Sequence, residues 1–143
     1  AIATGFLGGD TPAFTLVPVA DQFTGDATDA LVRVVHASPD APAVDVGPVT
    51  GGTVAPVADF RDLAFGDSSA AAGTVLPAGS LTIGVAATGT TTPVASFAVE
   101  ITEGLRAFAV ACGSLDGPGE SFRLALVVPG DPWAVVEVLP QTR

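Results

Sequence analysis

The sequence predicts an all-β protein, an antiparallel β-sandwich with an immunoglobulin-like or transthyretin-like layout. Large apolar residues alternate with small or polar ones over many short runs, as in strands that bury one face. The chain of 143 residues holds 17 Gly and 12 Pro, many of which punctuate these runs as turn signals. Only residues 57–65 show the helical spacing of apolar side chains, so we expect at most one or two helical turns there.

Five runs show the alternation most clearly. They cover residues 31–36, 81–85, 97–101, 108–112 and 122–128. In the first of them, Val32, Val34 and His36 share one face, and Arg33 and Val35 share the other. The turn signals at 76–79, 103–104 and 116–119 fall between such runs, and we expect the last of them to close a short hairpin.

The first nineteen residues are repeated near the end of the chain at a constant offset of 108 positions. Gly5 aligns with Gly113, and Leu16 aligns with Leu124. A constant offset is typical of tandem modules. We therefore expect residues 1–22 to be the closing hairpin of a preceding repeat and 23–30 to be a linker. Residues 31–131 would form one complete sandwich module, and 132–143 a C-terminal strand or tail, where 134–139 also resemble 30–35.

Charge and composition exclude several classes of function. Fifteen acidic residues against five arginines give a net charge of -10, which opposes binding to a nucleic-acid backbone. No apolar run approaches the ~18 residues of a membrane span. The single cysteine, Cys112, excludes an internal disulfide. The chain begins with neither Met nor a basic and apolar leader, so we expect a processed or excised piece from which any signal peptide is gone.

The most distinctive motif is VRVVHASPDAPAVDV at residues 32–46. It resembles the opening signature of a prokaryotic extracellular family of unknown function, and residues 63–66, 76–83 and 107–115 resemble later parts of that family. Gly47-Pro48 and the segment 50–58 depart from the family pattern. The resemblance implies an extracellular or cell-surface location and modules that occur singly or in tandem. It brings no catalytic or binding residues.

Six residues of this motif are expected to form a rigid structural turn: His36, Ser38, Pro39, Asp40, Pro42 and Asp45. The prolines fix φ, and the short polar side chains can cap backbone amides. The alternative is a metal site built from His36, Asp40 and Asp45, which would take zinc or calcium. No other cofactor is expected.

No catalytic constellation stands out, and we expect no enzyme. Residues 66–70 superficially resemble a serine-nucleophile turn, with His36 as base and Asp59 or Asp62 as orienting group, but the glycine after the serine is missing. Cys112 alternates with Phe108 and Val110, which indicates a small packed side chain rather than a reactive thiol.

The function expected from these observations is a non-catalytic extracellular structural or adhesive module of a surface protein or fibre. Its partners would be neighbouring copies or adjacent repeats, with residues 1–20 docking on the following module or entering a neighbour by strand exchange. The alternative is an accessory module that binds calcium or carbohydrate. Several loop carboxylates motivate calcium: Asp10, Asp21, Asp26, Asp29, Asp116 and Asp131. One Trp and no Tyr argue against a carbohydrate platform.

Overall fold

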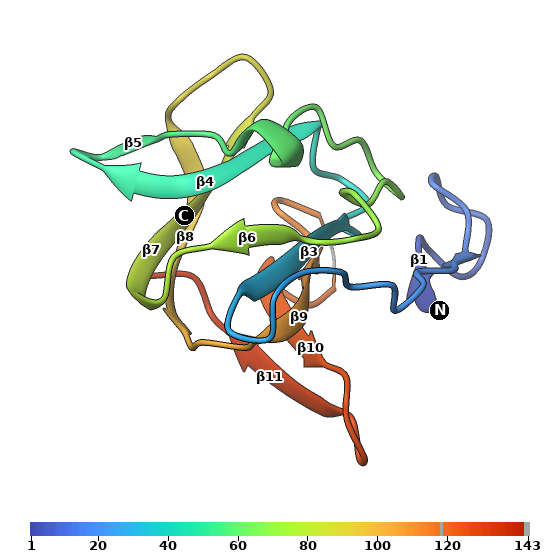
Figure 1. Cartoon of the computed structure of the whole chain (residues 1–143). Coiled ribbons are helices and arrows are strands. Elements are labelled where there is room, and N and C mark those ends of the chain that lie inside the picture. Colours follow the sequence, from blue (N-terminus) through green and yellow to red (C-terminus); the bar gives the residue numbers. More distant parts are fainter. Residues whose placement is uncertain (118, 142–143) are drawn as a thin grey trace.

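The computed structural model describes residues 1–117 and 119–141, and its regular structure is almost entirely β (Figure 1). Its strands are β1 (Ile2–Thr4), β2 (Thr15–Val17), β3 (Ala30–His36), β4 (Val44–Thr50), β5 (Thr53–Val54), β6 (Thr74–Leu76), β7 (Gly79–Ala87), β8 (Pro93–Ile101), β9 (Arg106–Cys112), β10 (Arg123–Val128) and β11 (Ala134–Val138). A sheet of five strands, ordered β11-β10-β9-β3-β6, packs against a sheet of four, ordered β5-β4-β7-β8. The predicted all-β sandwich is confirmed.

The main core lies between these two sheets. Its residues come from alternate positions of the strands, such as Val32 and Val34 in β3 and Phe97 and Val99 in β8. Phe97 and Phe122 are almost fully buried, and their ring centroids lie 6.0 Å apart. This packing joins the four-stranded sheet to the start of β10. Within 57–65, where at most one or two helical turns were expected, the structure has the 3-10 turn η1 (Ala58–Phe60), which buries Phe60.

The five-stranded sheet contains one parallel pair, β3 with β9, among otherwise antiparallel neighbours. All seven residues of β3 are buried, because this central strand is covered on both faces. Parallel strands end at the same edge of a sheet. The turn that follows β3 therefore lies beside the loop that follows β9, although the two are far apart in the sequence.

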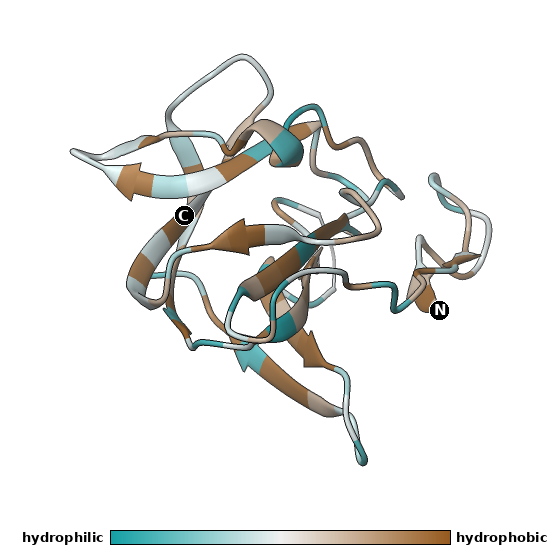
Figure 2. Cartoon of the chain, viewed as in Figure 1, coloured by the Kyte–Doolittle hydropathy of each residue, from teal (hydrophilic) through white to brown (hydrophobic). Residues whose placement is uncertain are grey.

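A second, smaller apolar cluster lies on the outer face of the five-stranded sheet. Its buried members are Val35, Ala37, Phe108 and Val110. Phe23 packs on Phe108 with ring centroids 5.0 Å apart. The large side chains of β9 thus point away from the main core, while Ala109 and Ala111 point into it. Figure 2 shows how strongly apolar β3 is between these two clusters. The segment predicted as a linker is therefore anchored through Phe23.

The N-terminal hairpin β1-β2 stands to one side of the sandwich (Figure 1) and has the local geometry of β9-β10. Ile2 pairs with Val17, and Val110, 108 positions after Ile2, pairs with Ala125. The glycine that ends each first strand, Gly5 or Gly113, has a φ of 82°. An ideal Cβ at Gly113 would lie 2.4 Å from the carbonyl oxygen of Ser121, so only glycine fits.

Beyond the strand β10, the chain turns back and adds β11 to the edge of the five-stranded sheet. β11 pairs antiparallel with β10, whereas β3, which it resembles in sequence, pairs in parallel with β9. The predicted loop 116–119 and tail 132–143 include residues 118 and 142–143, which lie outside the described residues. The described part of the chain has no helix long and apolar enough to cross a membrane.

Candidate functional site

The turn after β3 binds the loop after β9 through two short side chains. Ser38 is completely buried, and its hydroxyl donates to the carbonyl oxygen of Gly113 at 2.7 Å. Asp40 accepts a hydrogen bond from the Ser114 hydroxyl at 2.6 Å. Three successive amides also donate to its carboxylate: Leu115 at 2.8 Å, Asp116 at 2.9 Å and Gly117 at 2.8 Å. We name Ser38, Asp40 and loop 113–117 the closing lock.

The closing lock stabilises the ionised form of Asp40. Burial by itself would raise the pKa of this carboxyl group. The hydrogen bonds from the Ser114 hydroxyl and the three amides outweigh that effect and hold the pKa of Asp40 well below its ordinary value. The carboxylate thus holds the turn after β3 and loop 113–117 together.

His36 is buried within the same turn, and both of its ring nitrogens have protein partners. Its Nε2 lies 2.9 Å from the carbonyl oxygen of Pro42, and its Nδ1 lies 3.3 Å from the amide nitrogen of Ser38. A proton on Nε2 satisfies both contacts, since Nδ1 then accepts from Ser38. The ring meets Phe65 edge-on, at 6.3 Å between centroids. No nitrogen lone pair of His36 is directed toward an open site.

Asp45 belongs to the other sheet and to a different set of bonds. Its Oδ1 accepts from the Asp62 amide at 2.9 Å and the Thr88 hydroxyl at 3.3 Å, and its Oδ2 accepts from the Gly89 amide at 3.3 Å. Burial would raise the pKa of Asp45, but these hydrogen bonds and the charge of Arg61 lower it overall. Asp45 therefore fastens the segment after η1 and the β7-β8 turn to β4.

The structure does not bring His36, Asp40 and Asp45 together as one metal site. Within residues 1–117 and 119–141, no three His, Cys, Asp or Glu side chains gather closely enough to hold a metal ion. This also applies to the acidic loops that motivated calcium, where Asp29 instead accepts a hydrogen bond from the Asp26 amide at 3.3 Å.

The residues of the possible serine-nucleophile turn also have structural partners. The Ser69 hydroxyl accepts from the Val34 amide at 2.8 Å, and Ser68 accepts from Arg33 at 3.1 Å. Asp59 accepts from the Thr74 hydroxyl at 2.8 Å. In the described part of the chain, no hydrogen bond joins His36 to either serine. The geometry lacks the nucleophile-to-base contact that the chemistry requires.

Arg33 is a structural residue whose role the sequence did not reveal. It is buried on the outer face of β3, where its guanidinium donates to the carbonyl oxygens of Ala20 at 2.7 Å and Ser69 at 3.0 Å. It also lies over the Phe108 ring, 5.7 Å from the centroid. Burial lowers the pKa of Arg33. Through Ala20, this arginine fixes the end of the N-terminal segment to the module.

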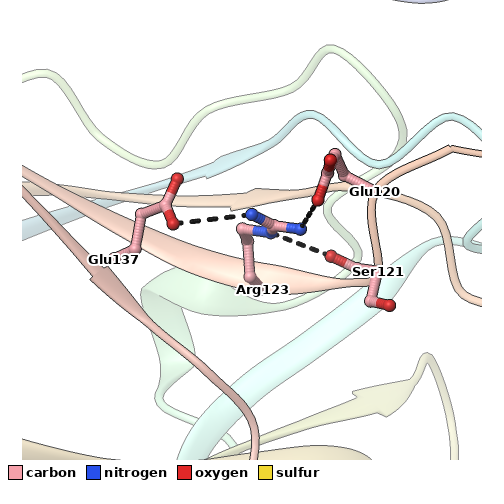
Figure 3. A network of polar contacts seen from close by, with 4 residues as sticks. All are labelled: Glu120, Ser121, Arg123 and Glu137. Carbon is pink, nitrogen blue, oxygen red and sulfur yellow. Dashed lines mark hydrogen bonds and ion pairs between the residues drawn. The ribbon is translucent and has the colours of Figure 1, made fainter.

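Figure 3 shows the polar contacts of Arg123 at the surface, of which the contact with Glu137 joins β10 to β11. Arg123 forms ion pairs with Glu120 and Glu137, and its Nε donates to the Ser121 carbonyl at 3.0 Å. The hydrogen bond and charge of Glu120 are the main reason why the pKa of Arg123 is raised. Both carboxylates are largely exposed, so these ion pairs contribute little to stability, and only the pair with Glu137 contacts β11.

Cys112 pairs with Arg123 in the register of β9 and β10 and is partly buried. Burial raises the pKa of its thiol, and the charge of Arg123 only partly opposes that effect. We expect the native chain to react with iodoacetamide at neutral pH more slowly than the urea-unfolded chain. The rate of thiol loss in each state checks this, and a faster native reaction would reveal an activated cysteine instead.

Except for Val75 on β6, the large exposed apolar side chains of the described residues lie on the two hairpins at the ends of the chain. One group lies on the N-terminal hairpin: Leu7, Phe14 and Leu16. The other lies on or beside β11: Trp133, Val135, Val136 and Leu139. We name the first group the uncovered face and the second the β11 surface. Polar groups of the motif are bonded internally, whereas the side chains of these two groups are exposed.

Two comparisons with known proteins give no match, and a third gives one. A family model described as Domain of unknown function (DUF4397) matches residues 30–134, which is more than half of the chain. No curated protein and no solved structure matches the chain.

Proposed function

We propose a structural, non-catalytic function, from the premise that this chain belongs to the DUF4397 family of domains of unknown function. The chain would be a structural or adhesive module of an extracellular surface protein or fibre. Its partners would be neighbouring copies or adjacent repeats. The observation that carries the proposal is that large apolar side chains are exposed on the hairpins at both ends of the chain, beside a packed sandwich core.

The internal use of the motif supports this proposal. A catalytic or metal site needs polar groups that are free to meet a substrate or an ion. Here Ser38, Asp40 and Asp45 bind backbone groups of the protein, and His36 is held between Pro42 and Ser38. These contacts make the motif a device for holding the module together.

The exposed edge of β11 supports association between copies. β11 is the outermost strand of its sheet, and Val136 on it is 54% exposed. A free strand edge with apolar side chains favours pairing with another strand. By contrast, the place of a closing hairpin within the sandwich is taken by β9-β10. Strand exchange between complete copies would therefore have to displace this hairpin, so we propose that copies associate through the β11 surface.

Sedimentation and light scattering over a wide concentration range test this proposal. We expect concentration-dependent oligomers or filaments from the unmodified chain and a monomer from Val136→Lys. The matched control is Val75→Lys, because Val75 is 56% exposed and lies on β6 at the opposite edge of the same sheet. If the unmodified chain is a monomer at every concentration, the proposal of self-association is wrong. Loss of association in the Val75 variant alone would place the contact at β6.

Carbohydrate binding is the alternative favoured by one observation. Trp133 is half-exposed and stacks on Phe108, with ring centroids 6.3 Å apart and planes 5° from parallel. It borders an apolar hollow that Ile2, Val19 and Val127 also line. Calorimetry with a panel of glycans, and separately with calcium, tests the accessory-module function. A saturable heat that Trp133→Ala abolishes would replace the structural proposal.

A further inference from the structure

The N-terminal hairpin β1-β2 is a copy of the closing hairpin β9-β10 without the rest of a sandwich around it. The two hairpins share their strand register and their loop hydrogen bonds. Phe6 donates its amide to the Pro12 carbonyl at 2.9 Å, and Ser114, 108 positions later, donates to Glu120 at 2.8 Å. They differ in their surroundings. Leu16 is 61% exposed, whereas the equivalent Leu124 is 6% exposed.

We propose that the uncovered face of β1-β2 docks with a second module of the same family. The docking segment would be equivalent to residues 30–108 of this chain, so that β1-β2 closes that module as β9-β10 closes this one. This docking rests on the proposed structural function and gives the module a partner and a contact surface. The template for the interface is present within the chain, since the contacts of β9-β10 show what such a hairpin meets.

The hairpin β9-β10, which is already covered, shows what the apolar half of this interface would look like. Phe122 packs at 6.0 Å from Phe97, within the core that β4, β7 and β8 form with the other sheet. Phe14 occupies the position equivalent to Phe122 and is 48% exposed. The docking segment would therefore bring a sheet like β4-β7-β8, with an aromatic side chain in the place of Phe97.

The polar half would come from a turn like that after β3. In the closing lock, the carboxylate of Asp40 accepts hydrogen bonds from the backbone amides of residues 115–117. The equivalent amides, those of residues 7–9, donate no hydrogen bond within the described part of the chain. Gly8 and Gly9 have φ values of 96° and 95°, unlike Asp116 and Gly117, so the free loop differs from the one that Asp40 binds. Glycine permits the rearrangement. The partner would thus supply a serine and a carboxylate.

A complete second copy does not fit this description. Within each copy, the residues of β3 and of the four-stranded sheet are already covered by β9-β10. The docking segment is one that lacks its own closing hairpin. The offset of 108 makes a covalent connection possible, because residue 108 of such a segment could be followed by Ala1 just as residue 108 of this chain is followed by residue 109.

The test is a longer chain in which residues 21–108 precede the intact residues 1–143. Hydrogen exchange followed by mass spectrometry reports the protection of amides 1–17. We expect their protection in the longer chain to rise to that of amides 109–125, and the added segment to be protected as well. Asp40→Ala in the added segment should reduce the protection of residues 1–17. The same substitution in the original segment is the matched control and should leave them protected.

Two results would overturn the inference. One is unchanged exchange of residues 1–17 in the longer chain, with an added segment that stays unprotected. The other is protection of residues 1–17 in the unmodified chain that rises with concentration, since a second complete copy would then be the partner. Neither result depends on the β11 surface. Self-association tested by Val136→Lys can therefore fail or succeed independently of this inference.

Discussion

Replacing Phe122 with alanine is expected to lower the free energy of unfolding by about 3–5 kcal/mol, as for other buried phenylalanines. Phe122 is 1% exposed and packs against Phe97 across the sandwich. Truncation would remove that contact and leave a cavity between the sheets. Urea unfolding followed by circular dichroism measures the change, read from the midpoint at a constant slope.

The matched control is Phe14→Ala, which makes the same chemical change at the equivalent position of the N-terminal hairpin. Phe14 is 48% exposed, so we expect its truncation to change the free energy of unfolding by no more than ~0.5 kcal/mol, as for surface substitutions. Equal losses in the two variants would mean that the hairpin face is covered in the isolated chain. The description of that face as uncovered would then be wrong.

Asp40→Asn is expected to cost about 1 kcal/mol at neutral pH, because hydrogen bonds to a charged acceptor are lost. Asp40 is exposed, so water screens part of the effect. The folded state lowers the pKa of Asp40, so its contribution is fully present above the unfolded pKa of ~3.9. The contribution is lost as the pH falls through the lower, folded pKa. The difference in the free energy of unfolding between the unmodified chain and Asp40→Asn should therefore become smaller in acid.

Unfolding of both proteins as a function of pH measures this difference directly. Asp45 also has a lowered pKa, but it affects both proteins alike. Subtracting one free energy of unfolding from the other at each pH therefore leaves the contribution of Asp40. Asp67→Asn is a suitable control, since among the described residues the carboxylate of Asp67 accepts one amide hydrogen bond, from Ala64 at 3.0 Å. A pH-independent difference, or an equal loss for Asp67→Asn, would contradict the closing lock.

The sandwich was predictable because alternation of residue size along a strand is a local signal. Strand pairing is not local. The parallel contact of β3 with β9 joins segments separated by the whole four-stranded sheet, and no residue of either strand indicates it. The sequence also did not show which face of β9 points into the core. Alternation identifies two faces, but it does not say which is the core when Phe23 and Trp133 cover the outer one.

The candidate site was predictable only in part for a similar reason. The motif at 32–46 marks a rigid turn, and Ser38 and Asp40 are residues that cap backbone amides. Their partners in loop 113–117 lie more than seventy positions further along the chain, where only the fold brings them close. Arg33 illustrates the limit most clearly. A charged residue in an apolar strand is usually exposed, yet here carbonyl oxygens and an aromatic ring surround it.

We infer that this chain acts through the apolar β surface at its C-terminal end rather than through a chemical site. Hydrogen exchange of the unmodified chain at low and high protein concentration tests this most directly. We expect the amides of residues 134–138 to gain protection as concentration rises, and the protection of the motif at 36–45 to stay the same. Protection that never changes with concentration, or that rises only in the motif after calcium or a glycan is added, would contradict it.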